Sequence, residues 1–461
     1  MPETNLLRGH LAIQGGPKPL LSYPVKATIA QVLAVSADAF DFFLIIALSP
    51  ILSKILLPPK TPPLLGAALI ILGYGLTGVI RPVGGALFGS LADKFGRRNL
   101  VIVTVLGIGL ASSTTGLLPT YVQAGFAGII LFSIIRGMIG LFLGGEYAAG
   151  YTFSMEWVRP KYRGLIGGLI QGGFGLGVFF SGIASLAFSD FFGAQNFASY
   201  GWRFAFFATL IPMAIAFFIR MSLNESPMFS RLTAEGKKEK SPFLSLFKRP
   251  HVYNLIQMIF LMAGAFLLYN GINGYLSVIL TKAPSILTLS LVAGIITFEG
   301  AGNSIGAIVY GTLSQYIGRR RFGMLGSLLG ILLIAPLTYY VVQFSTVGDV
   351  ISVMALVFAI GFLTNGPFGI LTAYATERFG TAQRASGTGF GYNGGYLIAA
   401  WFSFYVLYAH NLFADIEGLN IWLSAAFVSS IGAALMGIGF FAGPETSKLE
   451  FEKEFQQRSS S

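Results

Sequence analysis

Long apolar stretches alternate with short polar segments along almost the whole chain. Each stretch has about 20 or more residues, the length that an α-helix needs to cross the ~30 Å hydrocarbon core of a bilayer. Glycine and proline recur inside the stretches, as membrane helices tolerate. The expected spans are residues 27–56, 66–92, 99–118, 125–155, 162–188, 202–222, 251–281, 286–314, 321–343, 349–375, 385–409 and 420–443. The pattern therefore predicts an all-α membrane protein with twelve transmembrane helices.

The composition excludes an ordinary soluble enzyme. Of the 461 residues, 54% are hydrophobic and 11% are charged, whereas a soluble domain carries about 25% charged residues. Too few charges remain to cover a water-facing surface. The chain has no cysteine, which excludes disulfides, thiolate catalysis and cysteine-ligated metal sites. No Walker pattern is present, so we do not expect ATP to drive the activity, and we expect no cofactor and no metal.

The basic residues gather on one side of the expected topology. The chain has 30 Lys and Arg against 19 Asp and Glu, a formal net charge of +11. Most of the basic residues fall in the two tails and in alternate links, near residues 93–98, 156–163, 220–250, 316–321 and 376–384. The positive-inside rule places that side in the cytoplasm. We therefore expect a multi-pass protein of the cell (plasma) membrane with both termini cytoplasmic, and no nucleic-acid partner is needed to explain the charge.

A duplication divides the chain into two halves. Three sets of residues match at nearly the same offset: Gly89–Arg98 with Gly311–Arg320, Glu156 and Arg163 with Glu377 and Arg384, and Asn224–Pro227 with Pro444–Thr446. Matches at equivalent helix ends predict two six-helix bundles of the same orientation. The expected organisation is a cytoplasmic tail (1–26), a first bundle (27–222), a cytoplasmic linker (223–250), a second bundle (251–443) and a second cytoplasmic tail (444–461).

Parallel six-helix repeats are the organisation of major facilitator transporters, and individual motifs resemble that superfamily. Gly89–Arg98 resembles the signature loop between its second and third helices, and Asn224–Pro227 is similar to the end of the first half in sugar porters. Three further runs, Asp38–Leu44, Arg81–Gly85 and Arg136–Tyr147, resemble the sialate:proton and lactate/pyruvate:proton symporters, to which the phosphate:proton and metabolite:proton symporters are close.

The resemblance implies a transporter that works by alternating access as a monomer in the lipid bilayer, and not an enzyme. It further implies that a small-molecule substrate moves together with protons. The seventh span departs from part of this branch, because its segment Tyr269–Tyr275 lacks the His-rich signature of the fungal lactate carriers.

Six charged residues fall inside the expected spans, away from the span ends: Asp38, Asp41, Arg81, Arg136, Glu146 and Glu299. A charge at the bilayer centre costs at least ~2.5–3.5 kcal/mol, so these groups must be paired, protonated or hydrated. Asp41 with Arg136 is the preferred proton-coupling pair, because a carboxylate binds protons differently with and without an arginine beside it. The resemblance implies the same pairing of the first and fourth helices. The alternative is a permanent ion pair that fixes these helices together.

The other buried charges also carry alternatives. Arg81 is a candidate counter-ion for an anionic substrate, because guanidinium binds carboxylate bidentately and stays charged. Alternatively it neutralises Glu146 or Asp38. Glu146 follows two glycines that permit close helix approach, and its resemblance to phosphate:proton symporters implies a proton and substrate role, with helix packing as the alternative. Glu299 has no acidic counterpart in the first half, and is either a second proton site or a lone buried acid. Asp38 shares a helix face with Asp41 and is also a proton-coupling candidate.

Buried hydroxyl and amide groups complete the candidate substrate site, because such groups orient small polar ligands. These candidates are Tyr147, Gln171, Asn270, Asn273, Asn303, Asn365, Tyr392, Asn393 and Tyr396. The alternative for each is a hydrogen bond that bridges two helices.

A further set at the cytoplasmic helix ends has the signs required for ion pairs between the two halves. Such pairs would form when the inner side is shut and break when it opens. The set comprises Asp93, Arg97, Arg98, Glu156, Arg163, Arg319, Arg320, Glu377 and Arg384. We call these ion pairs between the halves the latch. Gln315 stands where the first half has Asp93, which predicts that the latch is weaker in the second half.

Three classes of function remain open at this point. The preferred one is proton-coupled uptake of a small organic anion, a monocarboxylate such as lactate or pyruvate. The second is the same machine acting on phosphate, a dicarboxylate, an aromatic acid or a sugar. The third, a nontransporting sensor or a channel, is disfavoured because a channel normally shows oligomeric pore symmetry and not an internal duplication.

Overall fold

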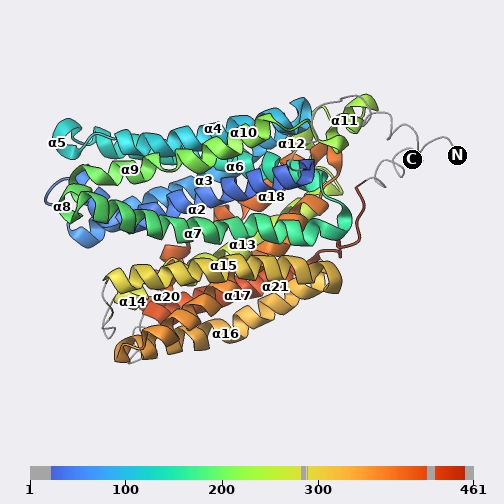
Figure 1. Ribbon diagram of the computed structural model, residues 1–461. Coiled ribbons are helices and arrows are strands. Elements are labelled where there is room, and N and C mark those ends of the chain that lie inside the picture. The colour runs from blue at the N-terminus through green and yellow to red at the C-terminus, as the bar shows by residue number, and fades with distance from the viewer. Residues whose placement is uncertain (1–21, 282–286, 288, 413–420, 452–461) are drawn as a thin grey trace.

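The computed structural model describes residues 22–281, 287, 289–412 and 421–451, and in these residues all the regular structure is helical (Figure 1). In chain order the elements are α2 (Tyr23–Leu56), α3 (Pro63–Phe95), α4 (Arg97–Thr114), η1 (Thr115–Leu117), α5 (Tyr121–Ala124), α6 (Ala127–Glu156), η2 (Pro160–Tyr162), α7 (Arg163–Phe192), α8 (Ala194–Asn196), η3 (Phe197–Gly201), α9 (Trp202–Phe207), α10 (Leu210–Met221), α11 (Pro227–Ala234), α12 (Pro242–Ser245), α13 (His251–Asn273), α14 (Leu276–Thr281), α15 (Leu289–Ile317), α16 (Arg319–Val347), α17 (Val350–Glu377), η4 (Thr381–Gln383), α18 (Arg384–Gly394), α19 (Tyr396–Ala399), α20 (Phe402–Leu412) and α21 (Ile421–Ala442).

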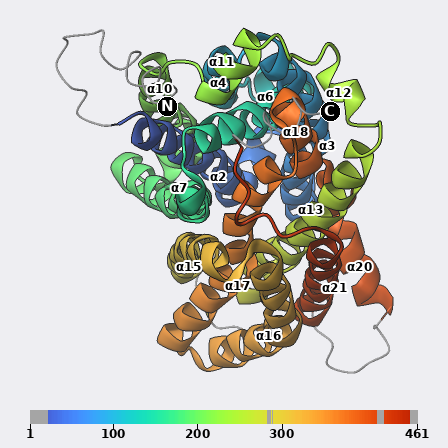
Figure 2. The same cartoon turned by 90° about the vertical axis from the view of Figure 1, so that its right-hand side faces the viewer.

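The long helices run roughly parallel to one axis and form two bundles, α2–α10 and α13–α21 (Figures 1 and 2). Nine helical segments of the described residues are long and apolar enough to cross a membrane. The other three of the twelve expected spans are occupied by α3, α15 and the interrupted run α18–α20. The architecture is therefore an all-α, twelve-span membrane fold in two six-helix bundles.

One end of the molecule, which we call the basic end, carries the arginine-rich turns of both halves. The first and last described residues lie there, as do α11 and α12 of the segment between the bundles (Figure 1). Contacts at this end join distant parts of the chain: Lys26 reaches Ser222, and Arg163 reaches the backbone oxygen of Leu449. Most of the two predicted tails, residues 1–21 and 452–461, lies outside the described residues.

Four spans expected as single helices are divided. The third comprises α4 and η1, the sixth α9 and α10, the seventh α13 and α14, and the eleventh α18, α19 and α20. Glycine lies at the junction of α18 and α19. A Cβ on Gly395 would lie 2.6 Å from the backbone of Ala263 and Met262, so only glycine allows α13 to come this close. The Gly395 backbone itself keeps helical angles, with φ of −57° and ψ of −28°.

The outward faces of the bundles are apolar. Large side chains such as Leu110, Ile134 and Leu332 are each more than half exposed, although water would disfavour such a surface. The arginines and carboxylates of the predicted spans are instead buried. This inversion identifies lipid as the surrounding solvent along the helices, because only the interior offers partners to charges.

Glycine lines the two most extensive helix contacts between the bundles. Between α7 and α15, a Cβ on Gly175 would lie 2.1 Å from the backbone oxygen of Gly300. Between α3 and α18, a Cβ on Gly85 would lie 2.5 Å from the backbone oxygen of Gly389. Small residues let helix backbones approach closely in membranes, so these two seams set the distance between the bundles near the site.

Candidate functional site

A buried triad of side chains lies near the middle of helices α2, α3 and α6. The Arg81 guanidinium pairs with the Asp38 carboxylate, with 2.8 Å between Arg81 Nη2 and Asp38 Oδ1. The Tyr147 hydroxyl donates to the other carboxylate oxygen, Asp38 Oδ2, at 2.9 Å. All three residues are at most 4% exposed. Of the two acids weighed as alternative partners of Arg81, the structure places Asp38, and not Glu146, against it.

Close packing within and between the bundles positions this triad. A Cβ on Gly144 would lie 2.0 Å from the backbone oxygen of Arg81, so α6 presses directly on α3 at this residue. The second bundle covers the triad with aromatic rings. The Tyr396 ring lies 5.2 Å from the Arg81 guanidinium carbon, and the Tyr392 and Tyr147 rings lie 5.1 Å apart. Arg81 therefore sits where the two bundles meet.

The second acid of α2, Asp41, pairs with Arg136 of α6. Arg136 Nη1 lies 2.6 Å from Asp41 Oδ2, and the Ser112 hydroxyl donates to the other carboxylate oxygen. Arg136 also donates to Thr115 Oγ1 at 2.7 Å. All of these residues belong to the first bundle. The structure thus brings together the two residues of the preferred coupling pair, and the partners that it describes for them belong to the first bundle.

Glu146 pairs with an arginine that sequence reasoning missed. Arg220 of α10 is 2% exposed and donates to both Glu146 carboxylate oxygens. It also donates to Gln31 Oε1 at 2.8 Å, while Thr104 Oγ1 donates to Glu146 at 2.7 Å. The sequence places Arg220 in the expected polar link near residues 220–250, at the end of the sixth span. Its position within the apolar run Ile219–Met221 was the available signal.

Glu299 of α15 is a buried acid of the second bundle, and its described partners are neutral. The Tyr269 hydroxyl and Asn303 Nδ2 each donate to Glu299 Oε1 at 3.2 Å. The carboxyl is 1% exposed. Tyr269 also places its ring 5.6 Å from that of Phe174 on α7, so this cluster reaches the first bundle through an aromatic contact.

A chain of amides crosses between the bundles beside the triad. The Tyr151 hydroxyl donates to Gln171 Oε1 at 3.0 Å, and Gln171 Nε2 donates to Asn365 Oδ1 at 3.4 Å. Asn365 Nδ2 in turn donates to the backbone oxygen of Asn303 at 3.0 Å. Sequence reasoning did not include Tyr151 among the site residues, although it lies one helical turn from Tyr147. The chain shows hydrogen-bonding groups of both halves meeting at one level.

The remaining polar candidates lie in the second bundle. Asn270 is 4% exposed. Asn273 donates to Thr364 Oγ1 at 2.9 Å, which bridges α13 and α17. Asn393 donates to the backbone oxygen of Gly389 in its own helix at 2.9 Å. Each amide nitrogen therefore bonds a helix, while Asn273 Oδ1 and Asn393 Oδ1 are buried without a hydrogen-bond partner among the described residues.

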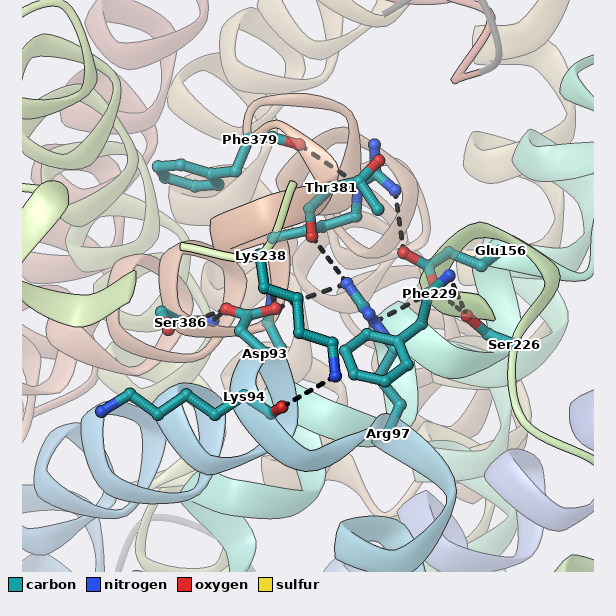
Figure 3. Close-up of polar contacts among 12 residues, drawn as sticks. Asp93, Lys94, Arg97, Glu156, Ser226, Phe229, Lys238, Phe379, Thr381 and Ser386 are labelled. Carbon is teal, nitrogen blue, oxygen red and sulfur yellow. Dashed lines mark hydrogen bonds and ion pairs between the residues drawn. The ribbon is translucent and has the colours of Figure 1, made fainter. Parts of the chain in front are cut away.

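At the basic end, a carboxylate of the first bundle binds a helix start of the second. Asp93 accepts from the backbone N–H of Ala385 at 3.1 Å, and from the N–H and hydroxyl of Ser386 at 2.8 Å each (Figure 3). These N–H groups belong to the first turn of α18, where the helix dipole favours a negative charge. Gln315 of the second bundle makes the equivalent contact with a helix start of the first bundle. Its side-chain oxygen accepts from Gly164 N of α7 at 3.1 Å.

An ion-pair network extends this contact. Glu156 lies 2.8 Å from Arg384 Nη1 of the second bundle and 3.1 Å from Arg97 Nε of the first. Arg97 Nη2 also donates to the backbone oxygen of Thr381 in the second bundle at 2.7 Å. Figure 3 shows Arg97 between Asp93, Glu156 and Thr381. The basic end is therefore closed by charged contacts between the bundles.

Several residues expected to pair between the halves instead act within one of them. Arg319 pairs with Glu377 of the same bundle at 3.1 Å. The Arg98 side chain donates to the backbone oxygens of Leu223 and Met221, and the Arg320 N–H donates to Glu445. The physical reason is helix geometry: both arginine turns begin a helix, so they face the polypeptide that leaves the sixth or twelfth span. Arg163 differs from these, because it joins the halves by donating to the backbone oxygen of Leu449 at 2.8 Å.

Among the described residues, no group of three or more His, Cys, Asp or Glu could hold a metal ion. A family model described as Major Facilitator Superfamily matches residues 32–403. The chain belongs to the Major Facilitator Superfamily. This protein is accordingly a multi-pass membrane transporter of small molecules and not an enzyme.

This transporter is similar along most of its length to relatives whose roles are described. It is 28% identical over 371 residues to the inner membrane metabolite transport protein YhjE of Escherichia coli, covering 80% of this chain and 83% of that protein. It is 26% identical to the sialic acid transporter NanX of Escherichia coli, covering 80% and 83%. The crystallised proton:xylose symporter XylE, bound to 6-bromo-6-deoxy-D-glucose, superposes with a TM-score of 0.72 at 17% identity, covering 94% and 99%. That likeness shows the shared fold.

Proposed function

We propose that this transporter couples the movement of a small organic anion, a monocarboxylate such as lactate or pyruvate, to that of protons. The observation that carries the proposal is the position of Arg81. It is a buried, permanently charged guanidinium near mid-helix that touches aromatic rings of both bundles. A site of this kind suits a carboxylate, because two N–H groups of guanidinium match the two carboxylate oxygens.

Proton coupling is supported by the number of buried acids and by the relatives. Asp38, Asp41, Glu146 and Glu299 are at most 5% exposed, and a buried carboxylate changes its protonation when its partner moves. XylE, which shares the fold, is a proton symporter. The substrate named for NanX, sialic acid, is a carboxylate. An acid–arginine site is consistent with both features.

Alternating access is supported by the contacts at the basic end. The bonds that join the bundles there, Asp93 to the start of α18 and Glu156 to Arg384, are few and polar. They can break as a unit when one bundle rocks against the other. We propose that the basic end is cytoplasmic, because its arginines follow the positive-inside rule, and that the protein works as a monomer in the plasma membrane.

A second candidate substrate class is a neutral, hydroxyl-bearing molecule such as a sugar. The observation that favours it is the amide chain of Gln171, Asn365 and Asn303, which offers donors and acceptors but no charge. Sites of this kind orient hydroxyl groups. With such a substrate, the charge of Arg81 would stay neutralised by a group of the protein and would have only a structural role.

Uptake by purified protein in liposomes would test these alternatives. An imposed inward proton gradient should drive accumulation of labelled lactate or pyruvate more than that of phosphate or xylose. Arg81→Lys should weaken the uptake of an anion by about tenfold or more, because lysine offers a point charge in place of a bidentate fork. Arg231 belongs to an exposed ion pair in the link between the bundles, and Arg231→Lys serves as the matched control. Accumulation of xylose but of no anion would support the second candidate, and uptake indifferent to the proton gradient would contradict proton coupling.

A further inference from the structure

The two acids of helix α2 differ in what surrounds them. Asp41 and Arg136 are bonded by Ser112 and Thr115, and every partner that the structure describes for this pair belongs to the first bundle. The pair can therefore travel with that bundle as one rigid unit. A rocking motion of the bundles alters contacts between them and leaves contacts inside each bundle unchanged. Rocking of the bundles therefore leaves the described hydrogen bonds of Asp41 in place.

Asp38 lies in the opposite situation. Its partners Arg81 and Tyr147 both contact rings of the second bundle: Arg81 lies 5.2 Å from the Tyr396 ring, and the Tyr147 ring lies 5.1 Å from that of Tyr392. The Tyr396 ring also packs against α3, because a Cβ on Gly78 would lie 3.0 Å from it. Separation of the bundles would remove these rings from the triad and admit water or substrate to Arg81.

The chain's own carboxylate thus occupies the position that a substrate carboxylate would take. Resting on the proposed function, we propose that Asp38, and not Asp41, carries the coupled proton, by competing with the substrate carboxylate for Arg81. When Asp38 takes a proton from water its charge is lost, and the guanidinium is released to bind the incoming anion. When the anion leaves, Asp38 gives up the proton and pairs with Arg81 again. One proton and one carboxylate therefore bind together or not at all.

The other charged groups described around Asp38 do not compete in this exchange for the proton or for Arg81. Arg81 faces it from α3 and Tyr147 from α6, with Tyr151 next to Tyr147 and with Tyr392 and Tyr396 behind them. Asp41 lies one turn further along α2 and is neutralised by Arg136. The other charged groups on helices packed against α2 lie at helix ends or in pairs of their own: Asp93, Lys94, Arg97, Arg98, Glu146, Glu156, Arg163, Asp190, Arg203 and Arg220.

Anion binding at different pH values tests the proposal directly. Lactate, pyruvate and sialic acid serve as probes, and their affinity for purified protein is measured by calorimetry between pH 5 and pH 8. For the wild type, anion affinity should fall about tenfold per pH unit above the midpoint, which is the pH at which half of the Asp38 carboxyls are protonated, as linkage to one proton requires. Asp38→Asn should bind the same anion with a flat pH profile and at least wild-type affinity at pH 8. In liposomes it should keep counterflow exchange and lose proton-driven accumulation.

Asp41→Asn is the comparison that separates the two acids, and it should retain the pH slope of the wild type. Tyr147→Phe supplies an independent measurement that keeps every charge. Its hydroxyl bonds the ionised form of Asp38, so removing it should move the midpoint upward by about one pH unit. An unchanged slope in Asp38→Asn, a flat profile in Asp41→Asn, or an unmoved midpoint in Tyr147→Phe would each overturn the assignment while leaving anion transport standing. Failure of all three probes to bind to the wild type at any pH would instead remove the proposed function, and the exchange with it.

Discussion

At the scale of single residues, the first bundle pairs each of the three acids inside its spans with a different arginine. Asp38 has Arg81, Asp41 has Arg136 and Glu146 has Arg220. Such pairing contributes little net stability, because both charges are removed from water, but loss of one partner leaves an uncompensated charge. The three pairs differ in exposure to the second bundle, and only the Asp38 triad lies against it. Their roles therefore follow from position and not from charge alone.

The Glu146–Arg220 pair is expected to be structural. Arg220→Gln would leave the Glu146 carboxylate buried beside Gln31 and Thr104, and should lower the free energy of unfolding by about 3–5 kcal/mol. The double variant Arg220→Gln with Glu146→Gln removes both charges and should recover most of that loss. Denaturant unfolding of the purified protein measures both differences.

An exposed pair provides the control for this prediction. Arg231 and Glu235 lie 3.0 Å apart in α11 with half of the Arg231 side chain exposed, and surface pairs contribute about 0–1 kcal/mol. Arg231→Gln should therefore unfold almost as the wild type does. If the double variant is no more stable than Arg220→Gln, the neutral-pair explanation is wrong, and Glu146 has a role that its charge alone supplies.

The sequence predicted these residues unevenly, for physical reasons. Charged residues in the middle of an apolar span, such as Asp41 and Arg136, are conspicuous because lipid cannot solvate them. Arg220 was not, because a basic residue near a span end normally reaches the polar interface. Which acid Arg81 would face also stayed open, since helix periodicity fixes the face of one helix but not its rotation against a neighbour.

At the scale of elements, the repeated glycine–arginine–arginine turn builds the same helix start twice. Gly96 and Gly318 each have φ of +110°, which side-chain-bearing residues rarely adopt. A carboxylate then sits on each new helix: Glu225 accepts from Arg98 N, and Glu445 accepts from the N–H groups of Arg319 and Arg320. The acids that close each half therefore cap α4 and α16.

Removal of the Glu445 charge should weaken the start of α16 in a pH-dependent way. Partial burial would raise the pKa of its carboxyl, but backbone N–H groups of Ser447 and Arg319 outweigh burial and hold the pKa below its ordinary value of 4.5. A lowered pKa means that the stabilisation is complete above pH 4.5 and is lost as the pH falls through the lowered value. Glu445→Gln should thus cost about 1 kcal/mol at pH 7, and progressively less below pH 4.5.

Thermal unfolding of the wild type and Glu445→Gln at pH 7 and at about pH 3 would measure this difference. Glu225→Gln, at the equivalent position of the first half, is the matched variant and should show a similar loss at pH 7. A difference between wild type and Glu445→Gln that stayed constant with pH would mean that the carboxylate charge does not matter to the cap.

Element boundaries were predictable where polarity changes and not where packing decides. The long helices α2, α6 and α17 end near the polar residues that delimit the expected spans. Hydropathy does not show the close approach of α13 to Gly395 at the junction of α18 and α19, because that approach depends on packing. A glycine inside an apolar span marks either a seam between helices or a break, and only the neighbouring helix distinguishes them.

At the scale of the whole molecule, the duplication predicted two bundles but not which repeated residues join them. Glu156 and Glu377 occupy matching positions, and each binds the arginine of its own bundle's helix start, Arg97 or Arg319. Only Glu156 also binds an arginine of the opposite bundle, Arg384. The latch is therefore asymmetric. This asymmetry arises from the relative placement of the bundles, which sequence symmetry alone does not fix.

The asymmetry gives a prediction about the conformational equilibrium. Glu156→Gln removes the charge that joins the bundles, whereas Glu377→Gln removes its counterpart inside the second bundle. A charge-assisted hydrogen bond contributes about 1.5–3 kcal/mol, so its loss should raise the population open at the basic end about tenfold or more.

Because the chain has no cysteine, Ala385→Cys gives a single reporter. This residue is fully buried in an apolar cluster that also contains Ala92 and Phe153 of the first bundle. Its labelling by a water-soluble maleimide should accelerate by a similar factor in the Glu156→Gln background and stay unchanged in the Glu377→Gln background. Equal acceleration in both would indicate general loosening of the basic end, and no acceleration in either would mean that the glycine seams, and not the charged latch, hold the bundles together there.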